Sequence, residues 1–255
     1  QKAVKRTVTI SDLSAVVTGI LIAYNMPHTA EWWQVVIVSA FSIAVCKQLF
    51  GGIGCNFVNP ALIARVVAQI SWPMSVSTFY LDGVSGATPL TVMKGGAMPE
   101  QSILDMFLGT NMPGCIGEIS ALALLVGGVY LVVRGVIKIN TPVAYVATVA
   151  VFVAIYGACT GRDVLNYTLA QVLGGGLMLG AIFMATDYVT APMTGKGQII
   201  FGVGCGLLTS VIRLFGGYPE GVSYSILLMN IVTPLIDKWT APRIYGTVKE
   251  VKQNG

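Results

Sequence analysis

Charged side chains are scarce in this sequence. Of its 255 residues only 10% are Asp, Glu, Lys or Arg, whereas 55% are hydrophobic, and the mean hydropathy is +0.76. A soluble domain carries roughly 25% charged residues, so a water-soluble fold of this length lacks the polar side chains to cover its surface. The apolar runs are long and continuous, which excludes a transmembrane β-barrel with its alternating segments of about ten residues. The composition therefore predicts a polytopic, all-α membrane protein embedded in a lipid bilayer.

Signatures of metal, nucleotide and nucleic-acid binding are missing as well. The sequence has one histidine, and none of its five cysteines forms a CxxC pair, so we expect no metal site. Most of the cysteines lie in apolar runs and are typical of small packing residues. A P-loop, a dinucleotide-binding fingerprint and a nucleophile triad are absent. The net charge of +4 is small and dispersed, which argues against a nucleic-acid partner.

Hydropathy predicts about eight membrane segments. Three precede a long polar interval at 74–115: 13–24, 33–50 and a half-helix at 56–65. The first of these is too short to cross a bilayer, which takes about 20 residues, and we expect a broken helix. Five follow the interval: 116–136, 142–158, 167–185, 198–213 and 222–236. We expect the glycines at 174–176 to lie inside a continuous helix and to permit close packing.

Lysine and arginine predict the orientation, because they concentrate in cytoplasmic loops. Basic residues occur in the N-terminal flank, in alternate connections and in the tail at 238–255. The opposite side includes the 74–115 interval, which carries a single lysine, Lys94. We therefore expect the tail to be cytoplasmic and the 74–115 interval to be extracytoplasmic.

An internal repeat indicates a transporter-like architecture. The sequence L-F-G-G occurs at 49–52 and again at 214–217, an offset that also relates Pro27 to Pro192. The predicted orientation makes the two copies run in opposite directions, and inverted repeats with broken helices build transporters. We predict a first repeat at 1–73 and a second at 116–237. The second has two spans without counterparts in the first, so we expect two further helices upstream of Gln1, ten in the whole protein.

The polar interval contains the stretch D-G-V-S-G-A-T-P-L at 82–90. Its small residues predict an exposed loop with little strand structure and an accessible Thr88. Gly83 and Gly86 allow the backbone to approach a bulky phosphate closely, and Ser85 offers a hydroxyl donor. By composition alone, an ordinary Gly/Ser turn explains the stretch equally well.

The residue order of this stretch resembles the flavinylation motif D-x-x-(S/T)-G-A-(T/S) of the NqrB/RnfD family of membrane subunits. The segments 59–65, 113–118 and 183–187 also resemble that family, and the likeness covers nearly the whole chain. It implies that a flavin transferase attaches FMN covalently to Thr88 through a phosphodiester. Asp82, Ser85, Gly86 and Ala87 would complete the motif. A second, non-covalent flavin such as riboflavin, near the broken helices, is also implied.

Pro89-Leu90 after the motif resembles the RnfD branch of the family. The branch implies a subunit of an Rnf complex, which passes electrons from ferredoxin to NAD and moves Na⁺ or H⁺ across the bacterial cell membrane. Other membrane and peripheral subunits would be its partners, and the chain would not catalyse the overall reaction alone. One alternative is the NqrB subunit of a Na⁺-translocating NADH:quinone oxidoreductase. Another is a channel without a redox role, because the inverted repeat with broken helices also resembles urea transporters.

Five polar residues close to apolar segments are candidates for a flavin site or an ion path: Asn25, Asn59, Arg65, Glu118 and Asp187. An acid inside a bilayer is costly and marks a functional site by default. We expect Asp187 to coordinate a cation with Asn25 or Asn59, and Arg65 to pair with an acid or to face a flavin. Helix-capping asparagines, interfacial carboxylates and a snorkelling arginine remain alternatives.

Overall fold

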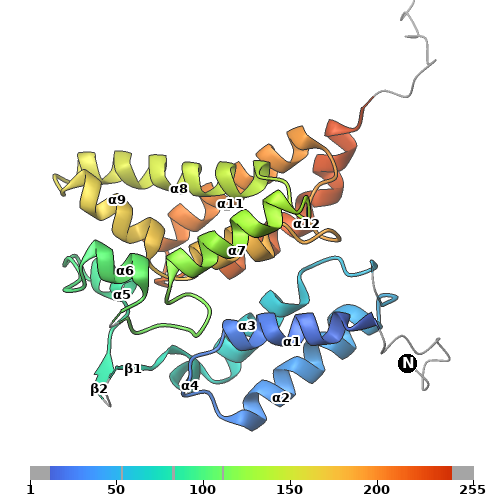
Figure 1. Cartoon of the computed structure of the whole chain (residues 1–255), viewed down its shortest axis with the longest axis horizontal. Helices are drawn as coiled ribbons and strands as arrows, with labels where there is room; N and C mark the ends of the chain where they lie inside the picture. Colours follow the sequence, from blue (N-terminus) through green and yellow to red (C-terminus); the bar gives the residue numbers. More distant parts are fainter. Residues whose placement is uncertain (1–11, 53, 82–83, 111, 243–255) are drawn as a thin grey trace, which may run out of the picture.

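The structure is a computed structural model that describes residues 12–52, 54–81, 84–110 and 112–242. Helices form two groups that lie beside each other, with a small hairpin and two short helices at one end (Figure 1). The first group holds α1 (Ser14–Tyr24), α2 (Trp32–Phe41), the π-helical η3 (Ser42–Gln48), α3 (Pro60–Ser71) and α4 (Pro73–Ser77). The second holds α7 (Ala121–Val133), α8 (Asn140–Cys159), α9 (Val164–Leu173), α10 (Leu177–Leu179), the π-helical η4 (Gly180–Met184), α11 (Gly195–Phe215) and α12 (Val222–Thr240).

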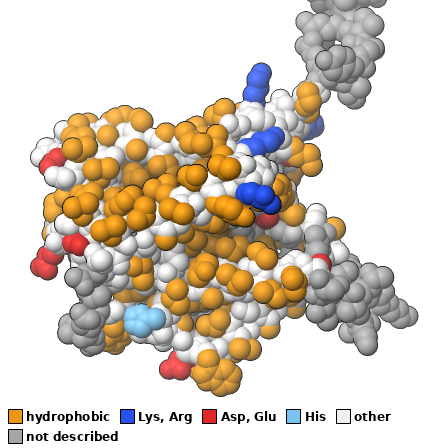
Figure 2. Space-filling model, viewed as in Figure 1, with side chains coloured by type: hydrophobic (Ala, Val, Ile, Leu, Met, Phe, Trp, Pro, Cys, Tyr) orange, Lys and Arg blue, Asp and Glu red, His pale blue; other side chains and the backbone are white. Residues whose placement is uncertain are grey.

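Several of these helices suit a bilayer. Among the described residues, α8 and α11 are long and apolar enough to cross one, and α9 with α10–η4 forms a third candidate that is bent by 60°. Four shorter apolar helices accompany them: α1, α2 with η3, α3 and α7. Hydrophobic side chains cover much of the visible surface (Figure 2). The all-α membrane class is thus confirmed, while the count of eight segments and the urea-transporter-like arrangement stay predictions.

The helix boundaries follow the hydropathy closely. The predicted segment at 13–24 is α1, and that at 33–50 is the pair α2–η3. Each L-F-G-G copy lies at the end of a long helix, since η3 ends at Gln48 and α11 ends at Phe215. The seventh segment, at 198–213, corresponds to α11, which begins three residues earlier.

The prediction of a continuous helix through 174–176 is wrong. These glycines separate α9 from α10, and Gly175 adopts φ +66°. A Cβ atom at Gly175 would lie 2.3 Å from the Leu90 side chain. The left-handed backbone breaks the helix, while the missing side chain leaves room for Leu90.

The polar interval is more structured than the predicted loop. It contains the hairpin of β1 (Phe79–Leu81) and β2 (Val84–Gly86), followed by α5 (Pro89–Lys94) and α6 (Ile103–Leu108). Leu90 and Met93 of α5 are buried in the main core, together with Met106 of α6. The interval is therefore anchored to the second helix group through apolar contacts.

Candidate functional site

Thr88 lies at the start of α5 and caps it. Its side-chain oxygen accepts a hydrogen bond from the Thr91 backbone N–H at 3.3 Å and lies 2.8 Å from the Thr91 hydroxyl. Pro89 occupies the first helical position, where proline's fixed φ suits the helix. The residue is only 7% exposed. The expectation of an accessible threonine on an open loop is wrong in this respect.

The rest of the flavinylation-like stretch lies next to the hairpin. Ala87 is exposed, and Gly86, which pairs with Phe79 in the hairpin, is half-buried. The backbone of Ser85 pairs with Tyr80. Asp82 and Gly83 lie outside the described residues, as do the basic N-terminal flank and residues 243–255. The buried Thr88 thus directly follows an exposed residue.

Two of the candidate asparagines meet where the broken helices of both groups come together. Asn25 follows α1, and its amide lies 3.7 Å from the sulfur of Met184, the last residue of η4. Asn59 caps α3 by accepting from the backbone N–H groups of Ala61 and Leu62. Its own amide donates to the Met184 carbonyl at 3.3 Å. Both asparagines therefore bridge the two groups, and Asn59 is also a capping residue.

Asn59 and Asp187 line one cavity of about 480 Å³ between the two helix groups. Apolar side chains from α1 and η4, among them Leu21 and Phe183, form part of its wall. Its polar side chains come from several segments: Asp12, Ser14, Thr18, Lys47, Asn56, Asn59, Thr186, Asp187 and Tyr188. The cavity offers both donors and acceptors beside an apolar surface.

Asp187 follows η4 and accepts a hydrogen bond from the Thr190 hydroxyl at 3.0 Å. Burial raises the pKa of its carboxyl, against the opposing effects of that hydrogen bond and of the Lys47 ammonium. Lys47 itself is only 6% exposed. The charges of a buried ammonium and a nearby carboxylate offset each other. This wall of the cavity therefore suits a polar, uncharged ligand as much as a cation.

Arg65 belongs to a separate buried cluster. Its guanidinium forms an ion pair with Glu220 at 2.8 Å and contacts the Cys115 sulfur at 2.8 Å. It also donates to the backbone carbonyl of Asn25. The sequence predicted that Arg65 either pairs with one of the candidate acids, Glu118 or Asp187, or faces a flavin. Its ion pair is instead with Glu220, because α3 crosses the turn that precedes α12.

Glu118 lies in the same cluster, in the segment before α7. Its carboxylate accepts from the Cys115 backbone N–H at 2.8 Å and is 7% exposed. Burial, reinforced by the negative charge of Glu220, raises the pKa of Glu118 to about 7, although Arg65 favours its ionised form. The cluster thus contains one acid in an ion pair, Glu220, and one acid, Glu118, whose ionised form is disfavoured by burial.

The sequence did not reveal Glu220 as the partner of Arg65, or Lys47 as the cation close to Asp187. Glu220 sits in a polar bend beside the second L-F-G-G copy, and Lys47 beside the first, so proximity to the repeat was the available signal. Among the described residues, no group of three or more His, Cys, Asp or Glu side chains is placed to hold a metal ion.

Comparisons with known proteins agree on one family. A profile described as the NQR2, RnfD, RnfE family matches residues 1–246. The chain is 52% identical to the D subunit of the Na(+)-translocating ferredoxin:NAD(+) oxidoreductase complex of Acetobacterium woodii, over 99% of this chain and 79% of the relative. It is 43% identical to the D subunit of the proton-translocating ferredoxin:NAD(+) oxidoreductase complex of Clostridium ljungdahlii, over 97% and 78%. The D subunit of an ion-translocating oxidoreductase complex of Pectobacterium atrosepticum is 34% identical, over 93% and 79%.

Proposed function

The chain belongs to the NQR2, RnfD, RnfE family, and we propose that it is a membrane subunit of an ion-translocating ferredoxin:NAD(+) oxidoreductase complex. The observation that carries this proposal is the 52% identity to the D subunit of such a complex over nearly the whole chain. The relatives' names specify different ions, Na⁺ in one and H⁺ in another. The proposal therefore covers cation translocation without choosing the ion.

The subunit carries covalent FMN on Thr88 in this proposal. The hydroxyl lies at the start of α5, next to the exposed Ala87, so a bulky group attached there can extend outward from the fold. Attachment requires that the contact with the Thr91 hydroxyl opens first, because the Thr88 hydroxyl is engaged in it. A flavin transferase would therefore act on a chain in which the Thr88 cap of α5 is open. When bound, the flavin supplies the redox chemistry, and the protein supplies its position.

The cavity between the helix groups is the proposed site of a second, non-covalent flavin. Its volume of about 480 Å³ falls within the roughly 300–1,000 Å³ of small-molecule pockets. An isoalloxazine has an apolar edge and an edge of N–H and C=O groups. Leu21 and Phe183 fit the first edge, and Asn59, Asn56 and Asp187 fit the second. Arg65 and Glu118 lie in the separate buried cluster, where they would stabilise the contact between the two helix groups.

The remaining parts of the proposal concern placement. The 74–115 interval is extracytoplasmic and the tail cytoplasmic, as the distribution of lysine and arginine predicts. Other subunits of the complex are its partners, as the names of the relatives indicate.

In-gel flavin fluorescence tests the covalent attachment. Wild-type protein from its native membrane should fluoresce after denaturation, and Thr88→Ala should abolish the signal. Thr110→Ala is the matched control, since Thr110 is an exposed threonine of the same polar interval, and it should keep full fluorescence. Fluorescence that survives in Thr88→Ala would contradict the attachment.

Copurification tests membership in the complex independently of the flavin. A subunit with several iron–sulfur clusters should copurify with the protein, and ferredoxin should reduce the preparation. Reduction by NADH with quinone as the acceptor would instead favour the quinone-reducing branch of the family. Transport without any redox partner would favour a channel.

A further inference from the structure

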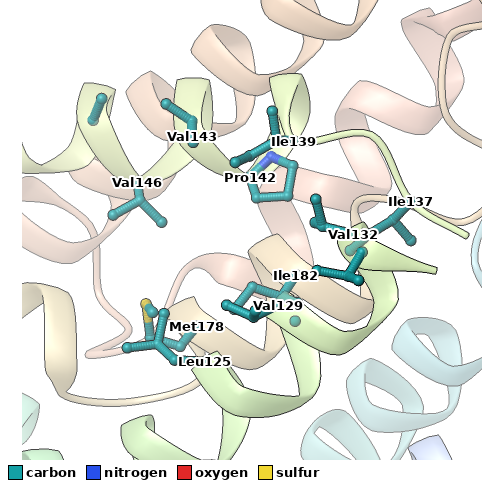
Figure 3. Close-up of a pocket in the computed structure, with 13 residues that line it drawn as sticks. Leu125, Val129, Val132, Ile137, Ile139, Pro142, Val143, Val146, Met178 and Ile182 are labelled. Carbon is teal, nitrogen blue, oxygen red and sulfur yellow. The ribbon is translucent and has the colours of Figure 1, made fainter. Parts of the chain in front are cut away.

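An apolar groove lies between α7 and α8, next to the cavity proposed for the second flavin, with which it shares Ile137. Its volume is about 430 Å³, and α10 and η4 form its floor through Met178 and Ile182 (Figure 3). The walls come from α7, from α8 and from the connection between them, and they carry aliphatic side chains together with the small residues Gly128 and Ala147. Within the described part of the chain, no charged or hydroxyl-bearing side chain lines it.

The depth of the groove depends on a close approach of α7 to its floor. A Cβ atom at Gly128 would lie 2.8 Å from the Ile182 side chain, so α7 packs here without a side chain between. Along the groove wall, Val129 is 62% exposed and Val133 is 79% exposed. The groove is therefore open along its length to whatever surrounds the helices.

Two cationic residues lie in the stretch of chain that closes one end of the groove. Arg134 follows the last wall residue of α7, and Lys138 lies between the wall residues Ile137 and Ile139 and also lines a neighbouring polar pocket. Both are exposed, and neither side chain forms an ion pair or a hydrogen bond with another described residue. Lysine and arginine side chains gather at this end of the molecule (Figure 2).

We propose that the groove binds an acyl chain of an anionic phospholipid whose phosphate contacts Arg134 and Lys138. From Leu125 to Val133 the α7 wall rises about 12 Å, close to half of a hydrocarbon core of roughly 30 Å. An acyl chain that starts at the level of the two cations would therefore reach towards the bilayer midplane. Basic residues next to grooves between membrane helices are typical of sites for anionic lipid headgroups.

The charges distinguish a lipid from a transmembrane helix of another subunit. A helix packed in this groove would bury unpaired cations beside it or would have to supply acids at one level, whereas a phospholipid carries its phosphate at the membrane surface. Among the described residues, the walls also carry no polar side chain of the kind that forms hydrogen bonds across helix–helix contacts in membranes. Both features favour a lipid as the occupant.

Photo-crosslinking tests the proposal on the complete protein with the subunits that copurify. The protein is reconstituted into vesicles that contain phosphatidylglycerol or phosphatidylcholine with a diazirine in one acyl chain, and labelled peptides are mapped by mass spectrometry. We expect labelling within 125–147, stronger for phosphatidylglycerol. Equal labelling by both lipids, or a groove protected by another subunit, would overturn the proposal.

Two pairs of variants separate the groove from general membrane contact. Val129→Trp fills the groove and should remove the labelling of 125–147. Val126→Trp places the same ring on the same helix, at a residue that is also 62% exposed but lies outside the groove. This variant should leave the labelling of 125–147 unchanged. Arg134→Gln with Lys138→Gln should reduce the preference for phosphatidylglycerol roughly ten- to thirtyfold. Lys196→Gln with Lys238→Gln removes equal charge from exposed positions on α11 and α12, and an equal loss there would overturn the proposal.

Discussion

The guanidinium of Arg65 on α3 lies 2.8 Å from the carboxylate of Glu220, which stands before α12. This ion pair joins the first helix group to the second at a point where both side chains are largely withdrawn from solvent. Since Arg65 also donates to the Asn25 carbonyl at the end of α1, one guanidinium connects three segments that belong to the helix crossing.

Removing the acid of this pair should destabilise the protein strongly. Glu220→Gln removes the carboxylate that forms the ion pair with the buried Arg65, and breaking a buried pair in this way costs about 3–5 kcal/mol. Thermal unfolding in detergent should show a large drop in the midpoint. Glu100→Gln, an exposed acid of the polar interval, is the control and should change little. Equal midpoints for the two variants would show that the pair contributes no net stability.

Glu118 should make stability depend on pH. Its pKa is raised from an ordinary value of 4.5 to about 7, first by burial and then by the charge of Glu220. A carboxyl whose pKa is higher in the folded state stabilises that state at acidic pH, and the contribution is lost as the pH rises from 4.5 through 7. The unfolding midpoint of the wild type should therefore fall over this range.

Glu118→Gln supplies the comparison for the pH effect. The amide keeps a side-chain oxygen that can accept from the Cys115 backbone N–H but does not titrate. Its unfolding midpoint should vary less between pH 4.5 and 7 than that of the wild type. A variant with the same pH dependence as the wild type would assign the effect to another group.

Thr91 should control how readily flavin is attached at Thr88. Its hydroxyl lies 2.8 Å from that of Thr88, and Thr91→Val replaces it with a methyl group of similar shape. One net hydrogen bond is lost, so opening of the cap should become roughly two- to tenfold easier. A time course of flavin incorporation with purified transferase should show faster labelling of Thr91→Val. Slower labelling would mean that the Thr91 hydroxyl assists attachment.

The helices were predictable because hydropathy alone defines them. The segments at 13–24 and 33–50 correspond to α1 and α2–η3, and the capping position of Asn59 before Pro60 was also open to prediction. The break at Gly175 was not predictable, since glycine in an apolar run is as consistent with close packing as with a left-handed turn. Close packing and a left-handed turn are distinguished only in the folded structure, where the Leu90 side chain packs against Gly175.

The pairings within the candidate site were not predictable from the sequence. The sequence selected acids and asparagines near apolar segments, and the structure places two of them, Asn59 and Asp187, in one cavity. The partner of Arg65 depends instead on a crossing of α3 with a turn 155 residues later, which no local pattern encodes. Thr88 illustrates the same limit, because its burial follows from a cap and from packing of α5 rather than from the small residues around it.

Gly175→Ala should destabilise both the helix break and α5. The residue has φ +66°, and its new methyl group would lie 2.3 Å from the Leu90 side chain. Left-handed strain costs about 1–2 kcal/mol, and displacement of a buried leucine adds about 1–3 kcal/mol. Gly217→Ala is the control, because a Cβ atom there meets no atom within 4 Å.

The location of the damage distinguishes this mechanism from a general loss of stability. Leu90 lies two residues beyond Thr88, so its displacement should loosen the first turn of α5 before the long helices respond. Hydrogen exchange should therefore accelerate at the amides of 91–94 in Gly175→Ala, while those of α8 and α11 stay protected. Accelerated exchange in all three helices would mean that the break at 174–176 supports the whole second helix group. Unchanged exchange in α5 would show that Leu90 finds another position without moving the turn that presents Thr88.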